Sequence, residues 1–253
     1  PRDRERGRLM LWYKAWRESQ TRFLLSALTM AGLCVVFVLF HGERNGISDR
    51  PLTYMEYIWR IVYKGYLREL FVLLALLLGV GGLLRERDWG TAGFTLALPV
   101  SRLHLVSVRA AVGLLEVAAL SFVPALVIPA LSPLAGQFYP WSQALQFSLL
   151  WTFGGALIFV LGFLASSVFA GEYTAPVAAF LALLVYSVIA DLPWVEHYAF
   201  DVHDIMSGVG MPYFQSDGSL LIGPLPWTAL AVILVVVFSL VALAGRIARQ
   251  QDF

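Results

Sequence analysis

Long apolar runs separated by short polar segments dominate the chain. A membrane-spanning helix needs about 20 mainly apolar residues, and six runs approach or exceed that length: 23–40, 68–84, 105–131, 144–169, 174–190 and 227–245. They lack the alternation of polar and apolar positions that is typical of barrel strands, so they predict helices. We expect an all-α membrane protein with a six-helix transmembrane bundle over residues 23–246.

The composition agrees with this class of protein. Hydrophobic residues make up 59% of the 253 residues and charged residues 14%, whereas soluble domains carry about 25% charged residues. Cys34 is the single cysteine, which excludes a disulfide within the chain and a thiolate metal site. The net charge is +1, and the lysines and arginines form no dense patch away from the membrane. We therefore expect no nucleic-acid partner.

The positive charges predict the orientation in the membrane. Lysine and arginine are retained preferentially on the cytoplasmic side. Thirteen of the 18 lie before Phe23, within 85–109 or after Gly245, and the other five lie within 44–68. We expect a multi-pass protein of the plasma (cytoplasmic) membrane with both termini in the cytoplasm. Residues 191–226 then form an extracytoplasmic segment, and residues 247–253 form a cytoplasmic tail.

An amphipathic segment precedes the first apolar run. Leu9, Trp12, Trp16 and Phe23 lie near one helical face, while Lys14, Arg17, Glu18 and Arg22 lie on another. Tryptophan, lysine and arginine favour the headgroup region, so residues 1–22 predict a helix in the membrane interface. Its key residues are Trp12, Trp16, Arg17 and Glu18. It either anchors the first span only or also forms part of a docking surface for a cytoplasmic partner.

The segment between the second and third apolar runs, residues 85–104, is charged and rich in turn residues. It contains a charged cluster from Arg85 to Asp88, then apolar side chains suited to a short helix, and Pro99. The residue before a proline is forced out of the helical region, so the short helix should end near Leu98. Ser101 is a suitable N-cap for the third span. The alternative is a solvated turn that only reverses the chain.

This pattern resembles the loop between the second and third spans of permease subunits in type-2 ATP-binding-cassette exporters. The family pattern is a charged cluster, Gly-Thr, a short apolar stretch and Leu-Pro-x-Ser-Arg. Here it corresponds to Glu86, Gly90-Thr91, Leu98-Pro99 and Ser101-Arg102. Trp16-Arg17-Glu18 is similar to a frequent opening of these permeases. The resemblance is local in motif and extends along the chain only in its six-span topology.

The resemblance implies that this loop is a cytoplasmic coupling helix that contacts a separate ATPase. The implied coupling residues are Glu86, Arg87, Trp89, Gly90, Thr91, Phe94, Pro99 and Arg102. The implied partners are an ATP-binding-cassette ATPase, which would hold ATP and Mg²⁺, and a second permease, as a homodimer or a related chain, in a lipid membrane. A P-loop needs Gly-Lys followed by Ser or Thr. Lys14 precedes Ala15 and Lys64 precedes Gly65, so the motor must be another polypeptide, and we expect no enzymatic activity and no cofactor in this chain.

Few other residues suggest chemistry. Glu116 lies inside the third run, where an acid costs about 3 kcal/mol and usually faces protein or water; it predicts either a structural hydrogen bond or a pathway or helix contact. His197 and His203 lie near acids, but their spacing fixes no metal site. Glycines and serines in the fourth run predict close helix packing. We therefore expect an exporter permease; the alternatives are an intramembrane enzyme or biogenesis factor, or a non-transporting membrane scaffold.

Overall fold

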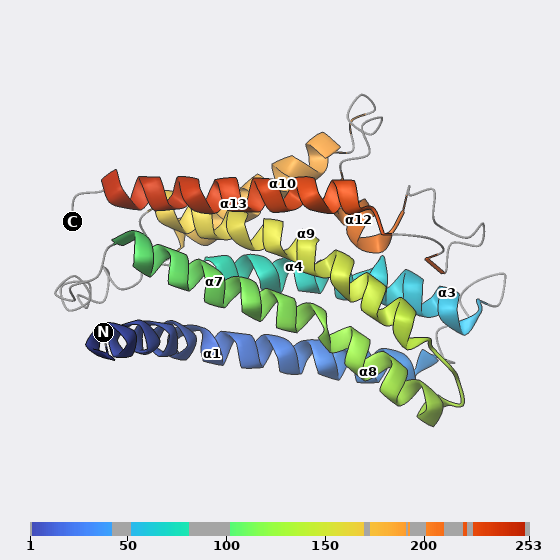
Figure 1. Ribbon diagram of the computed structural model, residues 1–253. Coiled ribbons are helices and arrows are strands. Elements are labelled where there is room, and N and C mark those ends of the chain that lie inside the picture. Colours follow the sequence, from blue (N-terminus) through green and yellow to red (C-terminus); the bar gives the residue numbers. More distant parts are fainter. Residues whose placement is uncertain are drawn as a thin grey trace.

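The computed structural model describes residues 2–41, 52–80, 102–169, 173–190, 192, 201–209, 220–221 and 225–250. These residues form a bundle of helices (Figure 1). The long helices are α1 (Arg2–Leu39), α4 (Tyr66–Gly79), α7 (Arg102–Ser121), α9 (Trp141–Val168), α10 (Thr174–Ala190) and α13 (Trp227–Gln250). The short ones are α3 (Tyr54–Ile58), the π-helical turn η2 (Trp59–Tyr63), α8 (Val123–Leu131), the 3-10 turn η3 (Ser132–Ala135) and α12 (Val202–Ser207).

The described residues agree with an all-α membrane protein. Four stretches are long and apolar enough to cross a bilayer: Leu11–Leu39, Leu103–Ala135, Trp141–Val168 and Trp227–Ile247. Thr174–Ile189 is apolar but shorter. The second expected span corresponds to α4, which has 14 residues, and residues 81–84 of that span lie outside the described residues. The membrane class is therefore supported, while the count of six spans stays a prediction.

Successive long helices run in alternating directions between the two ends of the bundle (Figure 1). The start of α1 and the end of α13 lie at the same end, which we call the terminal end; the end of α4 and the start of α7 lie there too. Helix α9 is central, because it packs against α4, α7, α8, α10, α12 and α13. The connection from α4 to α7, which holds the expected coupling loop, thus leaves and re-enters the bundle at the terminal end.

Helix α1 differs from the expected pair of elements. An interfacial helix over residues 1–22 and a span over 23–40 were expected, but α1 is one continuous helix of 38 residues. The physical reason is that no proline or glycine lies between Leu9 and Phe23, so nothing interrupts the hydrogen-bond ladder where the polarity changes. The change from polar to apolar residues therefore marks a depth in the membrane and not a helix end.

The third apolar run is interrupted by a proline. Helix α7 ends at Ser121, Phe122 forms a turn, and α8 continues with Pro124 in its first turn. Proline has no N–H to donate to the preceding turn and its ring clashes with the backbone there, whereas the first turn of a new helix tolerates it. The two helices together cover most of the expected span over 105–131.

Two parts of the core hold the helices together. In the first, Tyr63 stacks on Phe147 with ring centroids 4.2 Å apart, Phe71 stacks on Trp151, and Tyr63 meets Trp151 edge to face. In the second, α4 and α9 approach closely at glycines. A Cβ atom on Gly79 would collide with the backbone of Phe159, and one on Gly162 would lie 2.7 Å from the carbonyl oxygen of Leu76. The small residues predicted to allow close packing of the fourth run do so here.

Candidate functional site

The expected coupling residues are not part of the described structure. Glu86, Arg87, Trp89, Gly90, Thr91, Phe94 and Pro99 all lie outside the described residues, and Arg102 is described only as the first residue of α7. The roles assigned to these residues therefore stay predictions. The described part of the chain does show what the helix that follows this loop contacts, and those contacts define a candidate site between α1 and α7.

The first part of the site is an apolar seam between the start of α1 and the start of α7. Leu11 and Ala15 of α1 are buried in one cluster with Leu105, Val108 and Val112 of α7. Trp12 and Trp16, which were expected near the apolar face of this segment, stay exposed. The seam joins α7 to α1 directly after the expected coupling loop, while the two indoles face outward, where a membrane interface suits them.

Charged side chains border this seam. The guanidinium of Arg109 donates to a carboxylate oxygen of Glu18 at 2.8 Å, and Lys14 lies 3.7 Å from the other oxygen. The Arg109 side chain is 12% exposed and the Glu18 side chain 36%. Because the carboxylate keeps contact with solvent, the pair contributes on the order of 1 kcal/mol. It also fixes the rotation of α7 relative to α1 more than apolar contacts alone would.

Glu116 lies between the same two helices, farther along α7 than Arg109. Its side chain is 3% exposed, and the hydroxyl of Ser19 in α1 donates to its Oε1 atom. Its Oε2 atom is buried and has no hydrogen-bond partner among the described residues. The structure therefore turns this intramembrane acid toward protein and makes it a contact between two helices.

A cavity of about 30 Å³ lies beside Glu116. Its polar lining comes from Glu18, Ser19, Arg22, Arg109 and Glu116. Apolar residues form the rest of the lining: Ala15, Leu78, Gly79, Val112, Gly113, Phe159 and Phe163. Gly79 is the last residue of α4, so the cavity lies near the terminal end of the bundle. Residues of four helices, α1, α4, α7 and α9, thus line a small polar site.

Sequence reasoning found only part of this site. Glu18 and Glu116 were singled out from the sequence. Ser19 and Arg22 were missed as partners of Glu116. The short spacing between Glu18, Ser19 and Arg22 in α1 was the signal that the sequence offered. The sequence alone does not show, however, that α1 packs beside α7.

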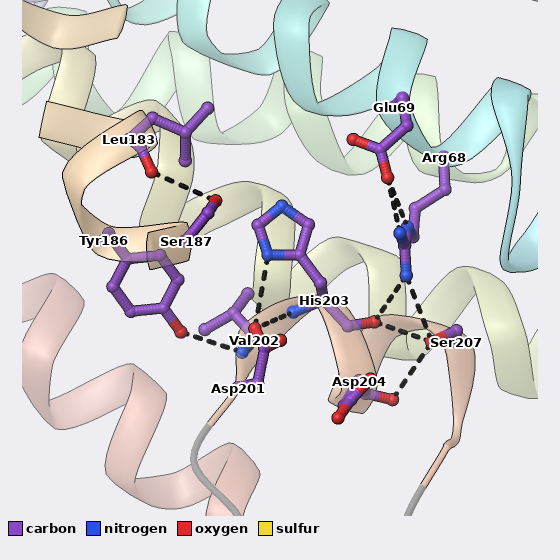
Figure 2. Close-up of polar contacts among 10 residues, drawn as sticks. All are labelled: Arg68, Glu69, Leu183, Tyr186, Ser187, Asp201, Val202, His203, Asp204 and Ser207. Carbon is purple, nitrogen blue, oxygen red and sulfur yellow. Dashed lines mark hydrogen bonds and ion pairs between the residues drawn. The ribbon is translucent and has the colours of Figure 1, made fainter. Parts of the chain in front are cut away.

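A second polar cluster fixes α12 at the opposite end of the bundle (Figure 2). Arg68 of α4 donates to the carbonyl oxygen of His203 at 3.1 Å and to the hydroxyl of Ser207 at 3.3 Å. The indole N–H of Trp59 donates to the carbonyl oxygen of Ser207 at 2.9 Å. The phenol of Tyr186 in α10 accepts the backbone N–H of Val202 at 2.9 Å. Side chains from three elements, η2, α4 and α10, therefore position a helix of six residues.

The same cluster bears on the two histidines considered as metal ligands. His203 points to Asp201, with 3.2 Å between Nδ1 and Oδ1 (Figure 2), and Asp201 also accepts the backbone N–H of His203 as the N-cap of α12. His197 lies outside the described residues. Within the described ranges, no group of three or more histidine, cysteine, aspartate and glutamate side chains could hold a metal ion.

The pKa values of the two α12 aspartates shift in opposite directions. Burial alone would raise the pKa of Asp201, but its hydrogen bonds to His203 and the charges of His203 and Arg68 outweigh burial and lower it. Burial, followed by the charge of Asp201, raises the pKa of Asp204. Ionised Asp201 therefore stabilises the folded state, and that stabilisation is lost as the pH falls through its folded pKa. Ionised Asp204 destabilises the folded state, and that cost appears as the pH rises through its folded pKa.

We expect opposite effects of neutralising these two aspartates. At about pH 7, Asp201→Asn should lower the Tm of the purified protein, although asparagine can still cap the helix, and Asp204→Asn should raise it. The Asp204 difference should disappear as the pH falls to about 4, the ordinary aspartate pKa, whereas the Asp201 difference should shrink only below that pH, because its folded pKa is lowered. Thermal unfolding in detergent at several pH values measures this. Shifts of the same sign at neutral pH would contradict the assignment of charges around α12.

No family model matches the chain, and no curated protein matches it either. The functional conclusion therefore rests on the sequence motif and on the contacts of the site.

Proposed function

We propose that this chain is the permease subunit of a type-2 ATP-binding-cassette exporter. In this proposal six spans, over residues 23–40, 68–84, 105–131, 144–169, 174–190 and 227–245, form half of a substrate pathway. Two copies, or one copy and a related permease, pair with two ATPase subunits at the cytoplasmic face. ATP binding and hydrolysis in the ATPase subunits then drive alternating access of the pathway.

One observation carries the proposal: the loop with the exporter-like motif connects α4 to α7, and α7 is joined to α1 directly after that loop. The contacts that support it are the apolar seam at Leu105 and Val108, the Glu18–Arg109 ion pair and the Ser19–Glu116 hydrogen bond. An ATPase can bias two arrangements of a permease only through contacts that differ between them. A force applied to residues 85–104 would reach α4, α7 and α1 together.

The charge pattern supports the same location for the ATPase. The two described helix ends that flank the expected coupling loop, the end of α4 and the start of α7, lie at the terminal end of the bundle with the start of α1 and the end of α13 (Figure 1). The sequence before Phe23, within 85–109 and after Gly245 carries thirteen of the 18 lysines and arginines. Such an excess is typical of a cytoplasmic face, where ATP is present. The chain itself contains no P-loop sequence, which fits a motor on a separate polypeptide.

Co-purification tests the proposal. The tagged protein is extracted from its native host in mild detergent, and the proteins that accompany it are identified by mass spectrometry. Wild type is expected to carry a soluble ATPase, and Glu86→Ala/Gly90→Trp is expected to lose it, because the variant removes a charge and adds a bulky indole in the coupling loop. The matched control is Glu56→Ala/Leu134→Trp, which makes the same kinds of change at the opposite end and should retain the ATPase.

The outcomes separate the competing functions. An ATPase retained by the control and lost by the loop variant supports the exporter permease. A partner without a nucleotide-binding domain that is lost in the same way favours a membrane scaffold. Recovery of no cytoplasmic partner in any sample overturns the proposal and leaves an intramembrane enzyme or biogenesis factor as the alternative.

A further inference from the structure

The cavity beside Glu116 contains an unmet hydrogen-bonding requirement. The Oε1 atom of Glu116 accepts from Ser19, but Oε2 is buried and has no partner among the described residues. A buried carboxylate oxygen without a donor, or a buried carboxyl O–H without an acceptor, destabilises the folded state, and the cost is larger for a charged group. Either protonation state of Glu116 therefore requires a further polar group at Oε2.

Water meets this requirement in both states. A polar site needs about 10–15 Å³ to hold one water molecule, and the cavity has a volume of about 30 Å³. Water donates to a carboxylate and accepts from a carboxylic acid. Glu18 lines the cavity and its side chain is 36% exposed, so the cavity extends to the molecular surface. Water in the cavity would thus connect Glu116 to the solvent.

The charges around the cavity leave both states of Glu116 accessible. Helix α1 contributes Glu18 and Arg22, and α7 contributes Arg109 beside Glu116; α4 and α9 contribute only uncharged residues. Arg109 is already bound to Glu18. Lys14 of α1 also lies 3.7 Å from Glu18, so Arg109 and Lys14 share the Glu18 carboxylate, and Arg22 is the further positive charge that lines the cavity. Arg22 favours the ionised form, whereas burial favours the neutral form.

We propose that this cavity is a hydrated proton-exchange site. A hydronium ion in the cavity gives its proton to Oε2 of Glu116 and becomes water, and the carboxylic acid returns the proton to water in the reverse step. The exchange alters the contact between α1 and α7, because a hydroxyl bonds more strongly to a carboxylate than to a neutral acid. Protonation of Glu116 weakens its bond to Ser19. The inference does not depend on the chain being an exporter.

Infrared difference spectroscopy of the full-length protein in lipid nanodiscs tests the proposal. Lowering the pH from about 9 to about 5, a range that strongly buried carboxyl groups can reach, is expected to produce a carboxylic acid C=O band. The band should shift to lower frequency in D₂O, because water in the cavity exchanges the proton. The band should be absent from Glu116→Gln, because glutamine keeps the shape of the side chain and one oxygen atom but has no carboxyl group. It should move to higher frequency in Ser19→Ala, which removes the hydroxyl donor.

Each other outcome overturns the proposal. An acid band that persists throughout the pH range means that Glu116 stays protonated. Absence of any pH-dependent band that Glu116→Gln removes means that it stays ionised, and a band unaffected by D₂O means that water does not reach it. If Glu116→Gln does not fold, Ser19→Ala decides the assignment, because a band that this variant leaves unmoved does not belong to Glu116.

Discussion

Gly79→Ala is expected to destabilise the bundle by at least about 1–3 kcal/mol, the typical cost of overpacking a core. The added methyl group would collide with the backbone of Phe159 in α9, and a backbone cannot rotate away as a side chain can. Helices α4 and α9 would have to separate along their whole contact. Thermal unfolding of the purified protein in detergent is the measurement, and Gly162→Ala, on the facing helix, should act in the same direction.

Gly32→Ala is the matched control for this prediction. Gly32 lies inside α1, and a Cβ atom added there would meet nothing within 4 Å. Alanine is favoured over glycine within a helix by up to about 1 kcal/mol, so this variant should leave the Tm unchanged or raise it. If Gly79→Ala were as stable as Gly32→Ala, α4 and α9 would not be packed backbone to backbone.

Arg68→Met is expected to increase amide hydrogen exchange in α12 at least tenfold. The variant keeps an apolar stem but removes the hydrogen bonds to the carbonyl oxygen of His203 and the hydroxyl of Ser207. A hydrogen bond to a charged group contributes about 1.5–3 kcal/mol, and the Arg68 side chain is only 13% exposed. Exchange followed by mass spectrometry over residues 202–207 measures the effect.

Arg60→Met provides the control on the neighbouring turn η2. The Arg60 side chain is 52% exposed and lies 3.5 Å from Glu56, four residues earlier on the same segment. Such exposed pairs contribute about 0.3–0.5 kcal/mol, so exchange in α12 should stay as in wild type. Equal exchange in the two variants would mean that Trp59 and Tyr186 hold α12 without help from Arg68.

The helical bundle was predictable because hydrophobic length is a strong local signal. Helices α9 and α10 begin and end close to the expected limits, α13 begins at the expected Trp227 but continues to Gln250, and the small residues of the fourth run do face another helix. The continuity of α1 was not predicted, since a change in polarity resembles an element boundary although only proline, glycine or a cap ends a helix. The break at Phe122 follows from Pro124, whose effect depends on local sequence.

The site was less predictable because its parts come from different helices. Glu116 was conspicuous in an apolar run, and Glu18 in an amphipathic one, yet nothing in the sequence links them. Their proximity depends on which faces of α1 and α7 meet, and packing of apolar side chains such as Leu11 and Val108 decides that. The anchoring of α12 by Arg68 and Trp59 was missed for the same reason.

The continuity of α1 has a mechanical consequence. At a rise of about 1.5 Å per residue, its 38 residues extend about 57 Å along the axis, compared with a hydrocarbon core of about 30 Å. The helix therefore reaches well beyond one face of the bilayer, and no hinge separates the protruding turns from the embedded ones. When such a rod pivots in the membrane, its two ends swing in opposite directions. A small sideways push near Leu11 would thus be felt on the far side of the bilayer, near Leu39, without any contact along the way having to break.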